Sequence, residues 1–398
     1  MSGLFAAAFL RRIGWDVDVF ERSPVELVGR GAGITTHPEL LEALEKSGAG
    51  TCDLGIEVVK RITIDRNGQV IGERPLRQIL TSWDRLQRLL RQTIDPAHYH
   101  LGLTFTRLEQ DSDGVRVHFA EGRVEEADLL IGGDGIRSTV RAQVAPDVQP
   151  IYAGYYIWRG APNEADLAAD TISSIFPYFV FFLPERQQVI GYPICGFDND
   201  LRPGRRRYNF IWYRVGDAEE LRRMCVDEHG RQHEFSVPPP LIRKDLIAQM
   251  RADAETIMPP AFLDCLRNIA HPFFTPIYDF SAPVIVFGRV ALVGDAASSA
   301  RPHMGFGVAK AAGDAQALAH ALHNHDDIDA GLARYNMMRQ PIGERIMLHG
   351  RRLGTHLGVD LKTEEDRRMW RLLQDGRAMM DWIAVPNFLD RSPIQLNR

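Results

Sequence analysis

The spacing of apolar residues changes several times along the chain, and each spacing predicts a different kind of element. The first dozen residues form an alanine-rich apolar run that is typical of a buried helix, and Gly14 ends it. The sequence WDVDVFE over residues 15–21 predicts a buried strand that closes on Glu21. A helix, a strand and an acidic residue in this order form the second half of a βαβ dinucleotide unit.

Shorter patterns fill the next hundred residues. They mix helical periodicity with the alternation that is typical of half-buried strands. We expect a loop over residues 31–34, a helix from Pro38, a helix over 82–92, a strand over 114–119 and an apolar strand over 127–132. The last of these strands runs directly into the turn Gly133-Asp134-Gly135.

From about residue 150 the pattern changes to aromatic and β-branched segments that turn residues separate. They predict an antiparallel sheet whose aromatic face suits the wall of a ligand site. The segments span residues 151–160, 178–184, 187–194 and 208–215.

The last third of the chain returns to helical patterns. A polar helical stretch covers about 240–270, and a buried strand over 289–293 then ends in the sequence GDAA. The loop RPHMGFG leads into a long helix over about 308–322. The remainder is helical and charged, with a Pro-containing tail over 386–398.

Composition narrows the possible classes of protein. The chain has 398 residues, 45% hydrophobic and 25% charged, with a net charge of −5, which indicates a folded protein and argues against a nucleic-acid binder. Its four cysteines show no CxxC spacing, so we expect no metal site, no disulfide framework and a reducing, cytoplasmic location. No apolar run reaches the ~18 residues of a membrane span.

The first residues also bear on where the polypeptide starts. The apolar run does not resemble a signal peptide, because its positive charges, Arg11 and Arg12, follow the run instead of preceding it. A dinucleotide unit that starts at its helix lacks the first strand and the first two glycines. We therefore expect the natural polypeptide to begin roughly 10–20 residues upstream, enough for one strand and a glycine turn.

The first of three candidate nucleotide motifs is the pair of Gly3 and Glu21. The glycine lets the helix pack close to a sheet, and free N–H groups at the helix start suit a pyrophosphate. Glu21 would accept hydrogen bonds from ribose hydroxyls. The alternative is that Glu21 is a solvated strand end beside Arg22.

The second motif is the turn around Asp134. Three glycines and this acid directly follow an apolar strand, and glycines permit close approach of the backbone to phosphates. Arg137 and Arg141 are four residues apart, so they can share one helix face and offer positive charge. The alternative is a tight turn with surface arginines.

The third motif combines Asp295 at the end of a strand with a glycine-bearing loop and a helix that starts near Val308. A carboxylate at this place can bind ribityl hydroxyls. The N–H groups around Gly305, Phe306 and Gly307 can point at developing negative charge. The alternative is a plain helix cap, and Asp314 within the helix favours a structural role.

In this order the three motifs resemble those of the FAD-dependent aromatic monooxygenases, the flavoprotein hydroxylases related to p-hydroxybenzoate hydroxylase. The segments IYAGYYIWRG, VIGYPICG, YNFIWY and RPHMGFGVAKAAGDAQAL extend the resemblance over essentially the whole chain. It implies an α/β fold with a Rossmann-like FAD-binding domain, here without its first strand, an inserted antiparallel substrate sheet and C-terminal helices. The implied divisions are 1–150 and 276–345 for the FAD-binding domain, 151–275 for the substrate sheet and 346–398 for the C-terminal segment.

The resemblance also implies a set of FAD-binding positions. They are Ser2, Gly3, Glu21, Arg22, Arg30, Gly33, Ile34, Trp83, Asp134, Asp295, Pro302, Gly305, Phe306 and Gly307. Two positions depart from the family pattern, because Ser298 stands where many relatives have His, and Trp83 where many have Arg or Gln. The incomplete fingerprint leaves open how tightly this polypeptide holds FAD.

The implied reaction uses NADPH or NADH and O2 to hydroxylate a small hydroxylated aromatic or N-heteroaromatic ring, such as a dihydroxypyridine, through a flavin C4a-hydroperoxide. His303, Tyr192 and Tyr213 are the candidates for deprotonating the ring hydroxyl, and each could instead only line the pocket. Arg159 could pair with an anionic substrate, with the flavin region or with a structural carboxylate. A larger quinone-precursor or polyketide-like substrate, a flavin-poor non-catalytic form and a homodimer are left open.

Overall fold

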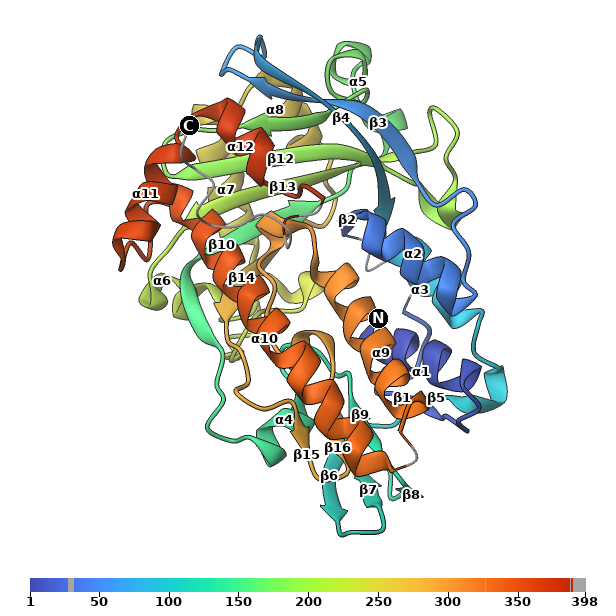
Figure 1. The fold of residues 1–398 in the computed structure, drawn as a ribbon. Coiled ribbons are helices and arrows are strands. Elements are labelled where there is room, and N and C mark those ends of the chain that lie inside the picture. The colour runs from blue at the N-terminus through green and yellow to red at the C-terminus, as the bar shows by residue number, and fades with distance from the viewer. Residues whose placement is uncertain (28–31, 326, 387, 389–398) are drawn as a thin grey trace.

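One large twisted sheet dominates the computed structural model, which describes residues 1–27, 32–325, 327–386 and 388 (Figure 1). Its eight strands follow the order β14-β10-β13-β12-β11-β3-β4-β2, and every neighbouring pair is antiparallel except β11 with β3. The strands are β2 (Gly33–Thr35), β3 (Ile56–Ile64), β4 (Val70–Ser82), β10 (Ile151–Gly160), β11 (Phe179–Phe182), β12 (Gln187–Ile194), β13 (Arg207–Val215) and β14 (Phe273–Asp279).

The four aromatic segments form strands as predicted, and the sheet extends beyond them. Strands β2, β3 and β4 come from residues 33–82, which the prediction assigned to the first part of the FAD-binding domain. The expected loop over residues 31–34 is wrong at Gly33 and Ile34, because β2 pairs there with the end of β4.

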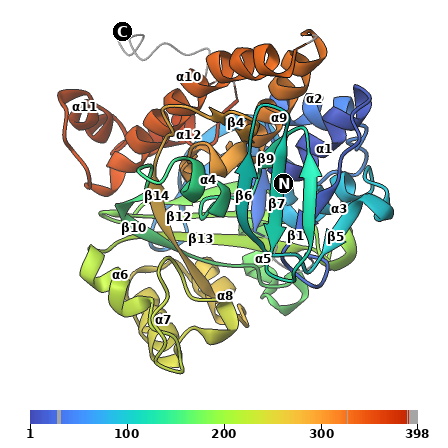
Figure 2. The same cartoon turned by 90° about the horizontal axis from the view of Figure 1, so that it is seen from below.

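The two faces of the sheet are covered by different parts of the chain. Helices α6 (Ala218–Met224), α7 (Lys244–Ile257) and α8 (Pro260–Arg267) cover one face of the sheet (Figure 2). A cluster of buried aromatic and aliphatic side chains joins them to it. The other face belongs to a second core cluster that also includes α1 (Ser2–Arg12) and α9 (Gly307–His323). The opposite faces of β10, β11, β12 and β13 thus serve two cores, because side chains alternate along a strand.

Short strands make up the rest of the β-structure. β1 (Val19–Glu21) is parallel to β5 (Tyr99–Leu101), and β9 (Leu130–Gly132) is parallel to β16 (Val290–Leu292), which also pairs with β15 (Val286–Phe287). These two parallel pairs belong to separate sheets in the described part of the chain. A meander of β6 (Phe105–Gln110), β7 (Val115–Phe119) and β8 (Val124–Ala127) lies near β9, β15 and β16 at one end of the molecule (Figure 1).

The strand expected over residues 15–21 is shorter in the structure. Only Val19–Glu21 pairs with β5, because the N–H of Trp15 donates to the carbonyl of Leu10 at the end of α1. The apolar strand expected over 127–132 likewise divides into the end of β8 and β9. Local patterns located both strands but overestimated their length, because strand length depends on the partner strand.

The remaining helices lie around these sheets, and the last three of them form the C-terminal part of the described chain. They are α2 (Pro38–Ser47), α3 (Trp83–Arg91), α4 (Thr139–Val144), α5 (Ala169–Ile175), α10 (Ile328–Gly354), α11 (Glu364–Leu372) and α12 (Gly376–Trp382). None of the helices described has the length and apolar character needed to cross a membrane. In the same residues, no cluster of three or more His, Cys, Asp or Glu side chains is arranged to hold a metal ion.

Candidate functional site

The turns of all three motifs meet at the first turn of α1. A Cβ atom on Gly133, which follows β9, would lie 2.9 Å from the backbone nitrogen of Gly3. A Cβ atom on Gly294, which follows β16 and has φ +61°, would lie 2.0 Å from Ser2 Oγ. Both positions therefore require glycine for close backbone approach. Segments almost 300 residues apart in the sequence thus form one junction.

The predicted acids Glu21 and Asp295 flank this junction. Burial lowers the pKa of the Met1 amino group, and both carboxylates act to raise it. The side chain of Asp295 is accessible from outside. Its pKa is nevertheless raised, because surrounding protein displaces much of the water around it, and the charge of Lys310 opposes this rise. A carboxylate that is both accessible and surrounded by protein suits the binding of ligand hydroxyls. The start of α1 has no side-chain cap, so its first N–H groups are available to an anion.

The charged residues of the second motif make contacts within the protein itself. Asp134 Oδ2 accepts hydrogen bonds from the N–H groups of Thr139 (2.7 Å) and Val140 (3.2 Å), and so caps α4. The expectation that Arg137 and Arg141 share a helix face is wrong, because α4 begins only at Thr139.

The two arginines of this motif are engaged by the protein itself. Arg141 donates to the carbonyl of Ala296 at 3.2 Å, which ties the second motif to the third. Arg137 donates to Ser236 Oγ at 2.8 Å. The glycine turn therefore contributes close backbone packing, and the arginines hold the surrounding loops together.

A buried ion cluster fixes the third motif. The N–H of Gly294 donates to Asp314 Oδ2 at 2.9 Å, and Lys310 Nζ donates to the carbonyl of Gly294 at 2.7 Å. Lys310 also pairs with Asp314 at 2.9 Å, and Arg339 of α10 pairs with it at 2.7 Å. These contacts hold both backbone groups of Gly294, and so they set the direction in which the neighbouring Asp295 points. Asp314 thus has the structural role that its position predicted.

The loop over residues 302–307 packs against the large sheet. Gly305 takes φ +59°, and its carbonyl is 3.1 Å from His37 Nε2. Like α1, helix α9 has no side-chain cap, so the N-terminal N–H groups that follow Phe306 face outward from the helix start. The positive end of a 17-residue helix therefore lies beside this loop.

The sheet presents three cross-strand rows of side chains to this side of the molecule. Strand alternation and register define them. The first row is Ile157, Tyr213 and Gln188, the second is Arg159, Ile211 and Ile190, and the third contains Asn209 and Tyr192.

His303 from the loop lies on the first row. Its ring stacks on Tyr213 with centroids 4.4 Å apart, and Nδ1 is 3.1 Å from Gln188 Oε1. Nε2 is 2.9 Å from the hydroxyl of Tyr155, which in turn accepts from Arg301 at 3.3 Å. This pattern is satisfied by a neutral imidazole with its proton on Nδ1. Burial lowers the pKa of His303 well below its usual value, which agrees with the neutral form.

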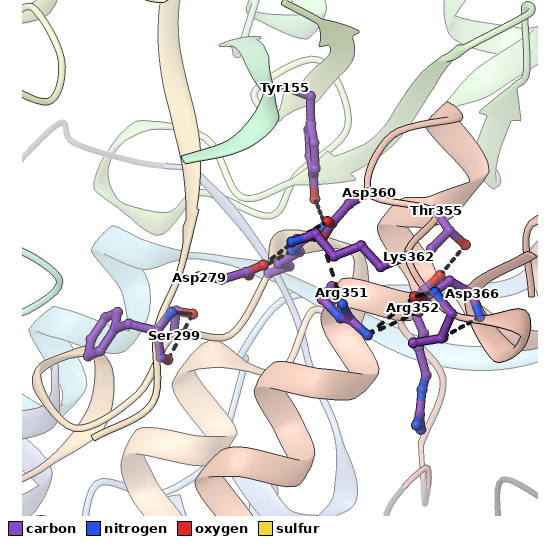
Figure 3. Close-up of polar contacts among 12 residues, drawn as sticks. Tyr155, Asp279, Ser299, Arg351, Arg352, Thr355, Asp360, Lys362 and Asp366 are labelled. Atoms are coloured by element: carbon purple, nitrogen blue, oxygen red, sulfur yellow. Dashed lines mark hydrogen bonds and ion pairs between the residues drawn. The ribbon is translucent and has the colours of Figure 1, made fainter. Parts of the chain in front are cut away.

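Arg301 anchors this arrangement from behind. Its buried side chain pairs with both carboxylate oxygens of Asp279 and lies 3.9 Å from Asp360. Asp360 continues the network to Arg351 of α10 at 3.8 Å, and Arg351 pairs with Asp366 at 3.1 Å (Figure 3). The C-terminal helices are thereby connected through Tyr155 to the ring of His303.

The third row meets β2. The N–H of Gly33 donates to Asn209 Oδ1 at 2.8 Å, and Tyr192 stacks on Phe179 with centroids 4.9 Å apart. Burial raises the pKa of Tyr192 to about 12 and that of Tyr213 further, so both phenols are neutral near pH 7. The three rows therefore present neutral phenols, isoleucines, the amides of Gln188 and Asn209, and the guanidinium group of Arg159.

The predicted residues fall into two groups. Ser2, Gly3, Glu21 and Asp295 gather at α1, whereas Gly33, Ile34, Tyr192, Tyr213 and residues 302–307 gather at the sheet. Trp83 joins the second group through its N–H, which donates to the carbonyl of Ala32 at 2.9 Å. Arg22 is exposed, and Arg30 lies outside the described residues.

Sequence reasoning missed several side chains that build this site. Tyr155, Gln188 and Asn209 contact residues of the predicted set, and Arg301 donates to Tyr155. The first three lie on different strands, and the register of the sheet is needed to place them on one face. Arg301 had no sequence signal, because its partners come from β14 and from the segment after α10.

Gly33→Ala tests the contact between β2 and the third row. The new Cβ atom would lie 2.5 Å from Asn209 Cγ and 2.6 Å from Tyr192 Cε2, so both side chains must move. We expect a loss of about 1–3 kcal/mol in the free energy of unfolding, measured in urea. Gly376→Ala is the control, because its Cβ atom would lie at an ordinary 3.5 Å from Thr63. Equal stability of the two variants would contradict the proposed close contact.

Comparisons with known proteins agree with this architecture. Residues 152–279 match a family described as FAD binding domain-like, and residues 273–349 match the family described as FAD binding domain. The chain is 33% identical to 2,6-dihydroxypyridine 3-monooxygenase of Paenarthrobacter nicotinovorans, over 90% of this chain and 89% of that protein. It is 28% identical to the FAD-dependent urate hydroxylase of Klebsiella pneumoniae, over 85% and 83% of the two chains.

Solved structures show the same fold. The 2,6-dihydroxypyridine-3-hydroxylase from Arthrobacter nicotinovorans superposes with a TM-score of 0.84 at 32% identity, over 89% of this chain and 90% of that one. Klebsiella pneumoniae HpxO, in a complex with FAD and uric acid, gives a TM-score of 0.73 at 23% identity, over 92% and 90%. The chain therefore belongs to the FAD-dependent aromatic monooxygenases, the flavoprotein oxidoreductases related to p-hydroxybenzoate hydroxylase, as its three motifs predicted.

Proposed function

We propose that the chain uses FAD, NADPH or NADH, and O2 to hydroxylate a small hydroxylated aromatic or N-heteroaromatic ring of the dihydroxypyridine type. The proposal rests on the two places at which the predicted residues gather, the start of α1 and the large sheet. The motif turns meet at the start of α1, and the loop over residues 302–307 packs on an aromatic wall that begins at Tyr213. One extended dinucleotide has the shape to connect such a phosphate site to such a wall.

The residues present fit FAD. Gly133 and Gly294 let both motif turns pack against the first turn of α1, whose uncapped start offers N–H groups to the pyrophosphate. Glu21 would accept from ribose hydroxyls and Asp295 from ribityl hydroxyls. The positive end of α9 would stabilise negative charge on the reduced ring. Bound FAD would supply the oxygen-activating redox chemistry, and the protein supplies position, charge and exclusion of water.

The aromatic wall supports a small, planar substrate. Relatives of the chain are named for 2,6-dihydroxypyridine, urate and 3-amino-4-hydroxybenzoate, all of which are compact rings with hydroxyl or oxo groups. Such a ring becomes more electron-rich when a hydroxyl loses its proton.

Among the candidate bases, His303 acts in our proposal as a positioning residue. Its Nε2 accepts a hydrogen bond from the hydroxyl of Tyr155, and its Nδ1–H donates one to Gln188 Oε1. The hydroxyls of Tyr192 and Tyr213 would contact the ring as neutral hydrogen-bonding groups. Ionisation of the substrate therefore depends on charge that stabilises its anion.

The test begins with the colour of the purified chain. It should bind FAD, and 2,6-dihydroxypyridine should stimulate both oxidation of NADH or NADPH and consumption of O2, with a hydroxylated product identified by mass spectrometry. A chain that cannot be reconstituted with FAD would overturn the proposal. So would a chain that reduces a carbonyl substrate without O2.

Asp295→Ala is expected to weaken FAD binding about 10- to 100-fold, because it removes the carboxylate that would accept from ribityl hydroxyls. The measurement is a titration of the apoprotein with FAD, followed by flavin fluorescence. Asp147→Ala removes an exposed carboxylate elsewhere on the surface and is the control. Equal FAD affinity of the two variants would contradict the role given to Asp295.

A further inference from the structure

Arg159 stands at the edge of the aromatic wall, in the middle row of the sheet. In β10 it alternates with Tyr155 and Ile157, so all three face the same side as His303. Its partner across the sheet is Ile211 of β13. It therefore lies between the row that carries His303 and the row that contacts Gly33. This is the part of the wall that a ring held between the loop over residues 302–307 and β2 would contact.

The guanidinium group of Arg159 is unpaired in the part of the chain that the structure describes. Within the described residues, it takes part in no ion pair and no hydrogen bond, and its Nε is enclosed without an acceptor. Other arginines of the sheet differ. Arg214 pairs with Asp253 at 2.6 Å, Arg207 lies 3.5 Å from Asp84, and Arg61 donates to backbone carbonyls. The structural salt bridge considered for Arg159 is thus absent from the part of the chain that the structure describes.

The surroundings of Arg159 cannot neutralise its charge. The ionisable groups that act on it are Tyr192 and Tyr213, and burial keeps both phenols protonated. Burial also lowers the pKa of Arg159 itself, as expected for a cation without a counter-ion. Removing an unpaired cation from water is strongly unfavourable unless an anion compensates for it. Part of the side chain is still accessible, so a ligand can reach it.

We propose that Arg159 binds an ionised oxygen of the ring substrate, so that the site selects anionic hydroxylated rings over neutral rings of the same shape. The inference rests on the proposed function and adds the charge of the substrate. The expected phosphate site lies at α1, whereas Arg159 belongs to the wall of the sheet. A planar guanidinium group can donate two parallel hydrogen bonds, for example to an oxyanion and a neighbouring ring atom. Holding the anion also favours the electron-rich form of the ring.

The experiment compares two probes in the full chain loaded with FAD. 2,6-Dihydroxypyridine can ionise, whereas 2,6-dimethoxypyridine has a similar ring and cannot. Binding is followed by intrinsic tryptophan fluorescence, so the readout does not depend on turnover. We expect Arg159→Gln to weaken binding of the dihydroxypyridine roughly 10- to 100-fold and to leave binding of the dimethoxypyridine within about twofold.

Arg214→Gln is the matched control, because Arg214 lies on the same sheet but pairs with Asp253 of α7. It should leave both affinities unchanged. Arg159→Lys keeps the charge and should recover part of the discrimination. FAD content of each variant is measured separately. This separates the two ideas, because a wild-type chain that cannot hold FAD contradicts the proposed function alone.

Three results would overturn the role of Arg159. The first is a wild-type chain that binds both probes equally. The second is an Arg159→Gln variant that loses FAD but binds the dihydroxypyridine normally once FAD is supplied in excess, which would assign Arg159 to the cofactor. The third is an equal loss of affinity for both probes, which would indicate a merely structural role.

Discussion

Asp314→Asn should lower the free energy of unfolding by about 3–5 kcal/mol, because it leaves two buried cations without their shared anion. The side chains of Asp314 and Lys310 are 3% and 1% exposed, and that of Arg339 is 12% exposed. Asparagine has nearly the same shape, so the loss reports charge rather than packing. Urea unfolding at pH 7 measures it.

The same substitution should also weaken FAD binding. Asp314 holds the N–H of Gly294 at 2.9 Å, and Gly294 needs its left-handed φ of +61° to bring Asp295 to the start of α1. A turn that loses this contact presents Asp295 less accurately. FAD titration of the folded variant at 10 °C separates this effect from unfolding.

The control is a pair with the same spacing on the surface. Lys46 and Glu42 are also four residues apart on a helix, but their side chains are 51% and 62% exposed. Glu42→Gln should change stability by less than about 0.5 kcal/mol, because water screens the exposed pair. A similar loss in both variants would show that the buried cluster is not the source of stability.

The sequence predicted those parts of the molecule that depend on local pattern. The helices that became α1, α2, α3 and α9, and the four aromatic strands, follow from periodicity and turn residues. The three motif turns were also located, because glycines after an apolar strand mark close backbone approach. Their convergence on Ser2 and Gly3 agrees with the prediction of one dinucleotide site.

The parts that were not predicted depend on contacts between distant segments. His303 forms hydrogen bonds with Tyr155, 148 positions away, and with Gln188, 115 positions away. Periodicity cannot relate such positions without the register of the sheet. The contact of Arg141 was missed for a similar reason, since its acceptor is the carbonyl of Ala296, 155 positions further along. Residue type predicted its charge, but only the fold shows what that charge contacts.

Acid should destabilise the folded protein well before its carboxylates titrate. Burial lowers the pKa of His37 and of His356 from 6.5 to about 4. Because the folded pKa lies below the unfolded one, the unfolded chain binds more protons between these values. Stability is therefore complete above about pH 6.5 and falls as the pH drops towards 4. At pH 5 each histidine accounts for a loss of about 2 kcal/mol.

The carboxylates of Asp314 and Asp295 change stability either at lower pH than the histidines do or in the opposite direction. The pKa of Asp314 is lowered by Lys310 and Arg339 despite its burial, so its contribution is lost only at lower pH. The raised pKa of Asp295 has the opposite sign and slightly favours the folded state on acidification. The fall between pH 6.5 and 5 therefore reports mainly the buried histidines, with His303 adding to it in the same direction.

His356→Leu isolates one of these contributions. The ring of His356 is buried and its Nε2 has no hydrogen-bond partner, so an apolar side chain can replace it. Urea unfolding at several pH values between 5 and 7 gives the slope of the free energy of unfolding against pH, and so the number of protons taken up on unfolding. The variant should take up fewer protons than the wild type, by up to one, because leucine binds none. His271→Leu, at an exposed position, is the control and should keep the wild-type slope. If the wild-type protein is equally stable at pH 7 and pH 5, then these imidazoles are not held in their neutral form by burial, and the packing described around the loop that carries His303 is wrong.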